Sequence, residues 1–113
     1  MQTEALLKLV ETELDDRKGL NIKTIDVRGK TSITDYMVIA TGTSSRHAKS
    51  LCDYVMEKVK EQGQQPLGLE GDQSSDWILL DLGDVIVHVM TGQARELYQL
   101  EKLWSVAGDK THI

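Results

Sequence analysis

The segment Trp77–Met90 constrains the fold more strongly than any other part of this sequence. It reads WILLDLGDVIVHVM, which is two runs of strand-forming apolar residues joined by Gly83 and Asp84. A Gly-Asp pair between two such runs is typical of a tight hairpin turn. With these two residues as the turn, Leu82 faces Val85 and the register of the two strands is fixed.

This register assigns every side chain of the hairpin to a face, because side chains alternate along a strand. One face is wholly aliphatic and is expected in the core: Ile78, Leu80, Leu82, Val85, Val87 and Val89. The other mixes apolar groups with a carboxylate and an imidazole, and we expect it to be partly covered: Trp77, Leu79, Asp81, Ile86, His88 and Met90. A shift of one residue would exchange the two faces.

Apolar periodicity predicts the other elements. Helices are expected over residues 2–16, ended by Gly19; over 46–62, capped by Ser44 or Ser45; and from Thr91 or Gly92 to about Trp104. Strands are expected over 21–27, 36–41 (a central strand) and 66–70 (an edge strand, because Pro66 lacks an N–H). The unit 36–70 is a candidate right-handed crossover between parallel strands. The sequence therefore predicts a single α/β domain, a mixed sheet of about five strands with flanking helices.

The last predicted helix contains one carboxylate on its apolar side. Glu101 falls within an arc formed by Ala94, Leu97, Tyr98, Leu100 and Trp104. A carboxylate there needs a cationic partner, in this chain or in another. A break near Gln99 would rotate the second half of the helix and remove the conflict.

Composition narrows the functional classes. At 113 residues the chain is one domain, with no apolar run of membrane-spanning length and no secretory pattern at its start. Cys52 is the only cysteine, which fits a reducing, cytoplasmic setting without an internal disulfide. The net charge of −5 argues against broad nucleic-acid binding. Residues 17–49 hold seven basic residues, whereas residues 70–101 hold seven acidic ones, so the second half can attract a basic partner.

No catalytic set stands out in the sequence. The turn Gly42–Ser45 follows a strand and precedes a helix, a geometry that can bind phosphate and that nucleotidyltransferases also use. However, the P-loop ending, the Gly-x-Gly-x-x-Gly pattern and an Asp-x-Asp metal pair are all missing. Asp81 and Asp84 flank a turn and are expected to serve it. The histidines (His47, His88 and His112) lack metal-ligand spacing, and His88 is expected to be a hydrogen-bonded sheet residue.

Large aromatic residues beside carboxylates indicate a binding surface instead. Trp77 follows Asp76, and Tyr98 and Trp104 flank Glu101. Such a combination is typical of an interface hot spot with an acidic rim, and the alternative is core filling. We expect Trp77 and Tyr98 at the surface and Trp104 in the core.

Several short motifs together resemble the ribosomal silencing factor family, also called the Iojap family. They are Asp26-Val-Arg28, the run from Thr34 to His47, Glu70-Gly71, Trp77 with Leu80-Asp81, the run from Gly83 to Val89, and Arg95-x-x-Tyr-x-Leu-Glu-x-Leu-Trp104. Each motif alone is weak, but in this order and spacing, over about residues 5–107, they are highly specific. The resemblance implies one domain over residues 1–107, a flexible tail over 108–113, and nucleotidyltransferase-like topology without the catalytic carboxylates.

The resemblance also implies a function without chemistry. Family members bind the large ribosomal subunit through ribosomal protein L-fourteen and block joining with the small subunit, which lowers translation when nutrients are scarce. It implies no enzyme activity, cofactor, metal or small-molecule substrate, and no binding to a membrane or to a specific nucleic-acid sequence. Members of the family often crystallise as homodimers, so a homodimer of the free protein is one possibility that the sequence leaves open, and the ribosome-bound form is expected to be one copy. The partner-binding residues expected here are Trp77, Tyr98, Leu100, Glu101, Asp76 and Glu70, with Glu101 paired to a partner cation. The alternatives are nucleotide binding or transfer at Gly42–Ser45, large-subunit assembly, and RNA binding through the basic half.

Overall fold

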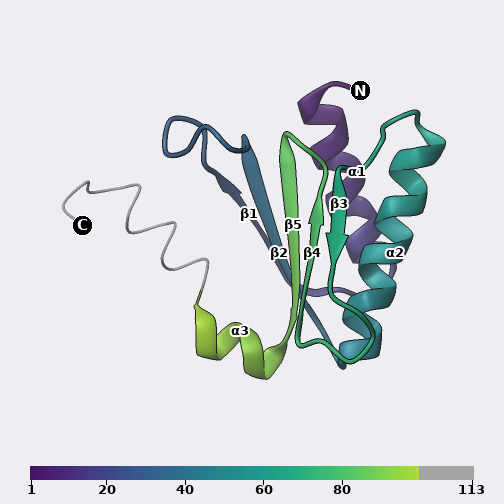
Figure 1. The fold of residues 1–113 in the computed structure, drawn as a ribbon, viewed down its shortest axis with the longest axis vertical. Coiled ribbons are helices and arrows are strands. Elements are labelled where there is room, and N and C mark those ends of the chain that lie inside the picture. The colour runs from purple at the N-terminus through teal and green to yellow at the C-terminus, as the bar shows by residue number, and fades with distance from the viewer. Residues whose placement is uncertain (100–113) are drawn as a thin grey trace.

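The computed structural model describes residues 1–99, and its elements follow the predicted order (Figure 1). They are α1 (Thr3–Asp16), β1 (Leu20–Asp26), β2 (Tyr36–Gly42), α2 (Ser45–Glu61), β3 (Gly68–Glu70), β4 (Trp77–Asp81), β5 (Val85–Thr91) and α3 (Gly92–Tyr98). Three predicted site or core residues (Leu100, Glu101 and Trp104), the domain boundary at 107 and the tail 108–113 lie outside the described residues. None of the described helices combines the length and apolar character that crossing a bilayer requires.

The five strands form one mixed sheet in the order β1-β2-β5-β4-β3. β2 and β5 run parallel, and every other neighbouring pair is antiparallel. The predicted α/β class and the mixed five-stranded sheet are therefore confirmed. The interior position of β2 agrees with its apolar character, although the middle strand is β5.

The hairpin has the predicted register. Leu80 pairs with Val87, and the N–H of Leu82 donates to the carbonyl of Val85 at 2.9 Å, which leaves Gly83 and Asp84 as the turn. Gly83 has a φ of 91°, a conformation that glycine adopts without steric cost. The Asp81 carboxylate accepts a hydrogen bond from the Gly83 N–H at 2.9 Å, so its expected turn role is also confirmed.

The two strands of the predicted crossover are parallel, as expected, but they are not neighbours in the sheet. The strands β2 and β3 point the same way, but β5 and β4 lie between them in the sheet. The hairpin inserts between the two strands because its aliphatic face is wholly buried and requires a central position. β3 is therefore an edge strand, as expected from the missing N–H of Pro66. It spans Gly68–Glu70 and is shorter than the predicted strand over 66–70.

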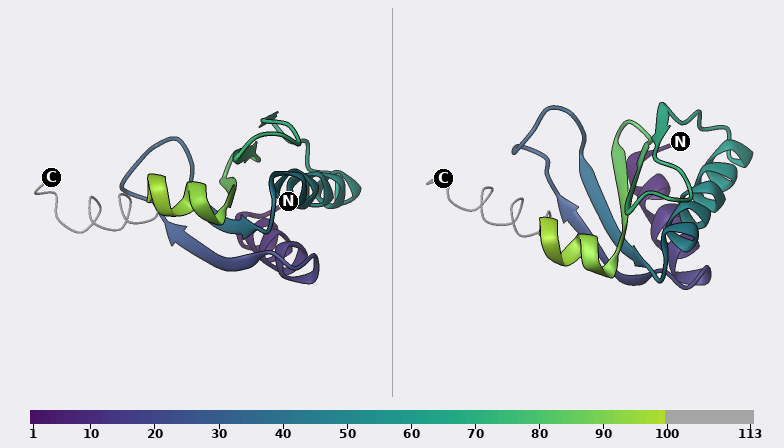
Figure 2. Two further views of the ribbon diagram at one scale, coloured as in Figure 1. Left: turned by 90° about the horizontal axis from the view of Figure 1, so that it is seen from below. Right: turned by 60° about the horizontal axis from the view of Figure 1, so that its bottom comes forward.

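The two long helices cover only one face of the sheet (Figures 1 and 2). On that face α1 and α2 pack on the aliphatic side of the hairpin, and all six of its predicted core residues are buried. Cys52 lies in this core, as expected, and burial raises the pKa of its thiol to about 12. The opposite face carries a smaller apolar cluster and the short helix α3 at one end.

Two helix ends differ from the prediction. The left-handed residue after α1 is Lys18 (φ 68°) rather than Gly19. Helix α3 ends at Tyr98 instead of Trp104, because Gln99 adopts the left-handed conformation (φ 48°, ψ 44°). A left-handed residue commonly terminates a helix, and the considered break near Gln99 is therefore confirmed.

Candidate functional site

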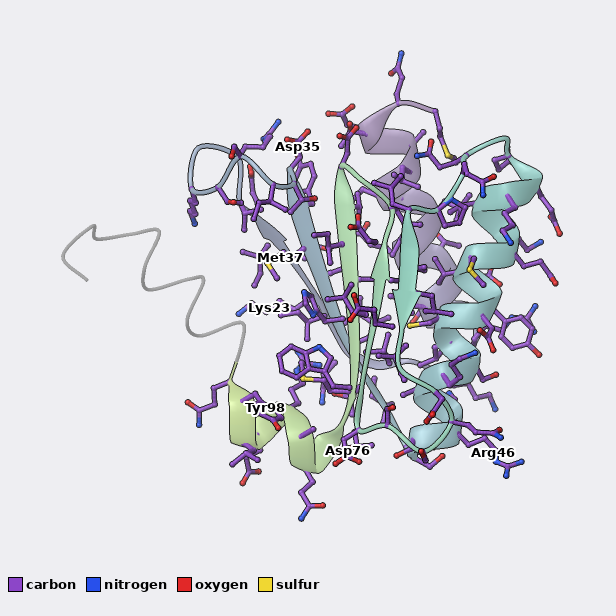
Figure 3. All side chains as sticks on the ribbon, viewed as in Figure 1. Lys23, Asp35, Met37, Arg46, Asp76 and Tyr98 are labelled. Atoms are coloured by element: carbon purple, nitrogen blue, oxygen red, sulfur yellow. The ribbon has the colours of Figure 1, made fainter. Side chains whose placement is uncertain are left out.

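The face of the sheet opposite α1 and α2 is here called the open face. It is defined by the side chains of Met37, Trp77, Leu79, Ile86 and His88, which alternate with the core residues along β2, β4 and β5. Helix α3 covers one end of it, and Figure 3 labels Tyr98 of α3 at that end, with Met37 farther along the sheet. The predicted partial cover of the hairpin's mixed face is confirmed, since these residues range from buried to half-buried.

An aromatic cluster occupies the end of the open face beside α3. The ring of Tyr98 lies 4.9 Å from the ring of Trp77, centroid to centroid, at an interplanar angle of 46°. The Trp77 indole Nε1–H donates to His88 Nδ1 at 3.0 Å. Trp77 is half-buried, whereas Tyr98 is 54% exposed, so the predicted surface position of Tyr98 is confirmed. Trp77 is thus anchored by one hydrogen bond and one ring contact, while part of the cluster stays accessible.

The His88 imidazole is neutral at physiological pH. Its side chain is only 5% exposed, and burial lowers its pKa to about 4. Because Nδ1 accepts the tryptophan hydrogen bond, we assign the single proton to Nε2. Among the described residues, Nε2 is buried and has no hydrogen-bond partner. A buried unsatisfied donor typically costs about 1–3 kcal/mol, so this atom calls for an explanation.

The two described acidic site residues both precede Trp77 in the chain. Glu70 of β3 is exposed and lines a hollow of 320 Å³ with Gly71, Trp77 and Leu79. Asp76 is also exposed, and its carboxylate lies 3.4 Å from the Ser45 hydroxyl, which donates to it. Four of the six predicted site residues are therefore described, and Trp77 meets both Tyr98 and the Glu70 hollow.

A second pocket on the open face was missed by sequence reasoning. It has a volume of 260 Å³ and an almost wholly apolar lining: Met37, Leu79, Ile86 and His88 from the sheet, with Thr31, Ile33 and Thr34 from the loop before β2. Ile33 is 76% exposed. An isolated isoleucine in an otherwise polar loop was the available signal, but only the fold brings that loop beside the hairpin.

The Gly42–Ser45 turn is built as a helix start. The Ser44 hydroxyl accepts from the backbone N–H of His47 at 3.1 Å, and His47 Nδ1 accepts from the backbone N–H of Thr43 at 2.9 Å. His47 Nε2 in turn lies 3.1 Å from the carbonyl of Arg17 at the end of α1. Two N–H groups that a phosphate would use are thus already bonded within the chain. No group of three potential metal ligands occurs among residues 1–99.

Replacing Ser44 by alanine is expected to lower the free energy of unfolding by about 1 kcal/mol, because the His47 N–H loses its capping acceptor. Urea denaturation would measure this loss. Ser32→Ala is the matched control, since Ser32 is an exposed serine in the loop before β2 and caps no helix. Equal stability of the two variants would contradict the capping role.

The basic half of the chain is partly neutralised by neighbouring carboxylates. Arg28 pairs with Asp26 at 2.7 Å, and these hydrogen bonds lower the pKa of Asp26 to about 2. Lys49 pairs with Asp53 at 2.7 Å, and Arg17 pairs with Glu13 at 3.2 Å. These pairs weaken the alternative of RNA binding through this half, because a paired cation attracts phosphate less strongly.

Comparisons with known proteins identify the family. A family model described as "Ribosomal silencing factor during starvation" matches residues 1–113. The chain is 50% identical over 101 residues to the "Ribosomal silencing factor RsfS" of Haemophilus influenzae, and the alignment covers 89% of this chain and 99% of that protein. It is also 35% identical over 96 residues to the mouse "Mitochondrial assembly of ribosomal large subunit protein 1", and this alignment covers 82% of this chain and 42% of that protein. A crystal structure of a Chromobacterium violaceum protein superposes with a TM-score of 0.89 at 41% identity, covering 93% of this chain and 88% of that chain. The sequence match and the fold agree, and the chain belongs to the ribosomal silencing factor (RsfS) family.

Proposed function

We propose that this protein represses translation by binding ribosomal protein L-fourteen on the large ribosomal subunit and blocking the approach of the small subunit. The observation that carries this proposal is the Trp77–Tyr98 cluster on the open face, where the ring of an exposed tyrosine contacts a half-buried tryptophan at a tilted angle. Rigid aromatic anchors of this kind dominate the binding energy of protein interfaces.

The charge of the surface fits a ribosomal partner. Glu70 shares a hollow with Trp77, and Asp76 precedes it in the chain. Ribosomal proteins are basic, so an acidic rim around apolar anchors complements them and steers their approach. In this proposal Leu100 and Glu101 extend the same surface, and Glu101 pairs with an arginine or lysine of L-fourteen. The name of the mouse relative, which refers to large-subunit assembly, supports the choice of subunit.

The proposed mechanism is steric exclusion in the cytoplasm, without catalysis, cofactor or small-molecule substrate. One copy binds each large subunit. The bonded N–H groups at the Gly42–Ser45 turn support a non-enzymatic role, because they leave fewer donors for a nucleotide phosphate.

Tyr98→Ala is expected to weaken binding to purified large subunits by about 2 kcal/mol, roughly thirtyfold in Kd, because it removes an exposed anchor from the cluster. Glu101→Ala is expected to weaken binding in the same direction. Co-sedimentation with isolated large subunits measures both effects. Added small subunits then report whether the joined-ribosome peak falls in the presence of the unmodified protein.

Tyr54→Ala is the matched control for the tyrosine. Tyr54 is 38% exposed, but it lies on α2 and its ring is covered by the Arg17 guanidinium at 3.9 Å. Its loss should leave Kd within about twofold, as expected for a residue outside the interface. If Tyr98→Ala and Glu101→Ala both bind normally, the assigned surface is wrong. Binding without any effect on subunit joining would favour a role in large-subunit assembly instead.

A further inference from the structure

The 260 Å³ pocket of the open face is a hollow that residues 1–99 leave open to solvent. Its walls come from the sheet and from the loop before β2, and they are almost wholly apolar. Ile33 on the loop wall is 76% exposed. Helix α3 covers only the other end of this face, where Tyr98 meets Trp77 (Figures 2 and 3). Because apolar walls are unfavourable in water, an apolar side chain placed over them would be stabilised by burial.

The described part of the chain ends beside this same face. Gln99 directly follows Tyr98, whose ring lies 4.9 Å from the ring of Trp77. Gln99 adopts the left-handed conformation, which ends α3 and changes the direction of the backbone. Residues 100–113 follow, and their large apolar side chains are Leu100, Leu103, Trp104, Val106 and Ile113. The open face therefore has an apolar segment of its own chain next to it.

The length of chain up to Trp104 matches the distance to the pocket. Leu79 lies two residues along β4 from Trp77, and Ile86 of β5 lies two steps farther in the same direction. At about 3.3 Å per residue, these two walls are about 7 and about 13 Å from Trp77 along the sheet. Trp104 comes five residues after Gln99, and five residues span about 7 Å when helical and about 17 Å when extended. The pocket is thus within reach of Trp104.

Trp104 also suits the pocket by size and chemistry. It is the largest side chain of the segment, and a buried aromatic ring removes about 150–250 Å² from water. Leu103 or Val106 would leave part of the volume empty and forfeit contacts with the walls. The pocket is open at the exposed Ile33, where the indole N–H can keep its contact with water. This position also agrees with the core location expected for Trp104 from the sequence.

We infer that the indole of Trp104 occupies the 260 Å³ pocket and thereby acts as a positioning residue for ribosome binding. This inference rests on the proposed function, which assigns Leu100 and Glu101 to the partner-binding surface. With Tyr98 against Trp77 and Trp104 in the pocket, these two residues belong to a short segment that is held at both ends. Holding a segment before it binds reduces the conformational entropy that binding must remove. The partner therefore gains affinity from a side chain that it does not touch.

Nuclear Overhauser cross-peaks in the free, full-length protein test the position of Trp104 without any substitution. Cross-peaks are expected between its ring protons and the methyl groups of Ile33 and Ile86, because such signals arise only between protons in close contact. Their absence overturns the inference, and cross-peaks from Leu103 in their place overturn the choice of Trp104. In a mixture of labelled and unlabelled protein, cross-peaks that connect only different copies also overturn it, because a second copy then fills the pocket.

Binding to purified large subunits tests the positioning role. Trp104→Ala and Ile33→Ser each remove one side of the contact, and each is expected to raise Kd about tenfold. The double variant is expected to lose no more than either single variant, because the two residues share one contact. Trp104→Phe retains a ring for the pocket and should restore most of the affinity. Leu67→Ser is the matched control for Ile33→Ser, since Leu67 is 70% exposed but does not line the pocket. The control should leave Kd within about twofold.

The possible failures of the two proposals are distinguishable. Additive losses in the double variant, or normal binding by Trp104→Ala, overturn the positioning role while the proposed function stands. Failure of the unmodified protein to bind large subunits overturns the proposed function and the positioning role together. The cross-peaks of the free protein are independent of the ribosome, so they test the location of Trp104 in either case.

Discussion

Replacing Gly42 by valine is expected to lower the free energy of unfolding by about 3 kcal/mol, near the upper end for overpacking a core. Gly42 ends β2 and is buried against the first turn of α2. A Cβ atom at this position would lie 2.7 Å from the backbone nitrogen of Ala48 and 2.9 Å from its Cα. Because both atoms belong to the helix backbone, the strand and helix would have to separate. Urea denaturation without any nucleotide measures the effect.

Gly68→Val is the matched control for this substitution. Gly68 also lies in a strand without a positive φ, but no atom lies within 4 Å of its added Cβ. Valine favours strands, so the control should stay within about 0.5 kcal/mol of the unmodified protein. If the two variants are equally stable, α2 does not sit against β2 as described. A large loss at Gly42 alone explains this glycine by packing, without any role in phosphate binding.

Local chemistry explains which parts of the fold could be predicted from the sequence. The hairpin register follows from Gly83 and from strict alternation of side chains, and both are properties of one short segment. The helix start at Ser44 follows in the same way from its capping hydroxyl. The insertion of the hairpin between β2 and β3 could not be predicted in this way, because the order of strands depends on which faces are buried together.

The helix ends at Lys18 and Gln99 show a second reason why prediction from the sequence was incomplete. Both residues adopt left-handed conformations that are usual for glycine. The N–H of Gln99 bonds to the Arg95 carbonyl at 3.0 Å, so backbone hydrogen bonding supports this end. Nothing in the side chain of a lysine or glutamine marks such a conformation. Prediction from residue type therefore extended α3 too far.

The sequence suggested residues for the candidate site but not the shape of the surface on which they lie. Trp77 and Tyr98 were identified because large aromatics beside carboxylates are typical of interfaces, and the structure brings their rings to 4.9 Å. The 260 Å³ pocket on the open face depends instead on contact between the loop 31–34 and strands more than 40 residues later in the chain. A pocket whose walls are distant in sequence leaves no local pattern.

Lowering the pH from 7.5 to 5 is expected to destabilise the protein by about 2 kcal/mol through His88 alone. The folded-state pKa is about 4, below the ordinary 6.5 that applies to the unfolded chain, because the ring is buried. Between these two values the unfolded chain binds a proton that the folded protein excludes. The stabilisation is therefore fully present above pH 6.5 and falls as the pH drops. Its loss totals about 3 kcal/mol by pH 4.

Urea denaturation at several pH values between 7.5 and 5 measures this dependence, and His88→Asn provides the reference. The Asn Oδ1 can accept the Trp77 Nε1–H in place of His88 Nδ1, and the variant retains His47 and His112. Its stability should fall less steeply with pH, and the difference between the two slopes isolates the buried imidazole. Parallel curves for the two proteins would mean that His88 is solvated or paired in the folded state. A neutral, buried His88 is also the form that keeps its proton on Nε2, so this titration tests the electrostatic state on which the open face depends.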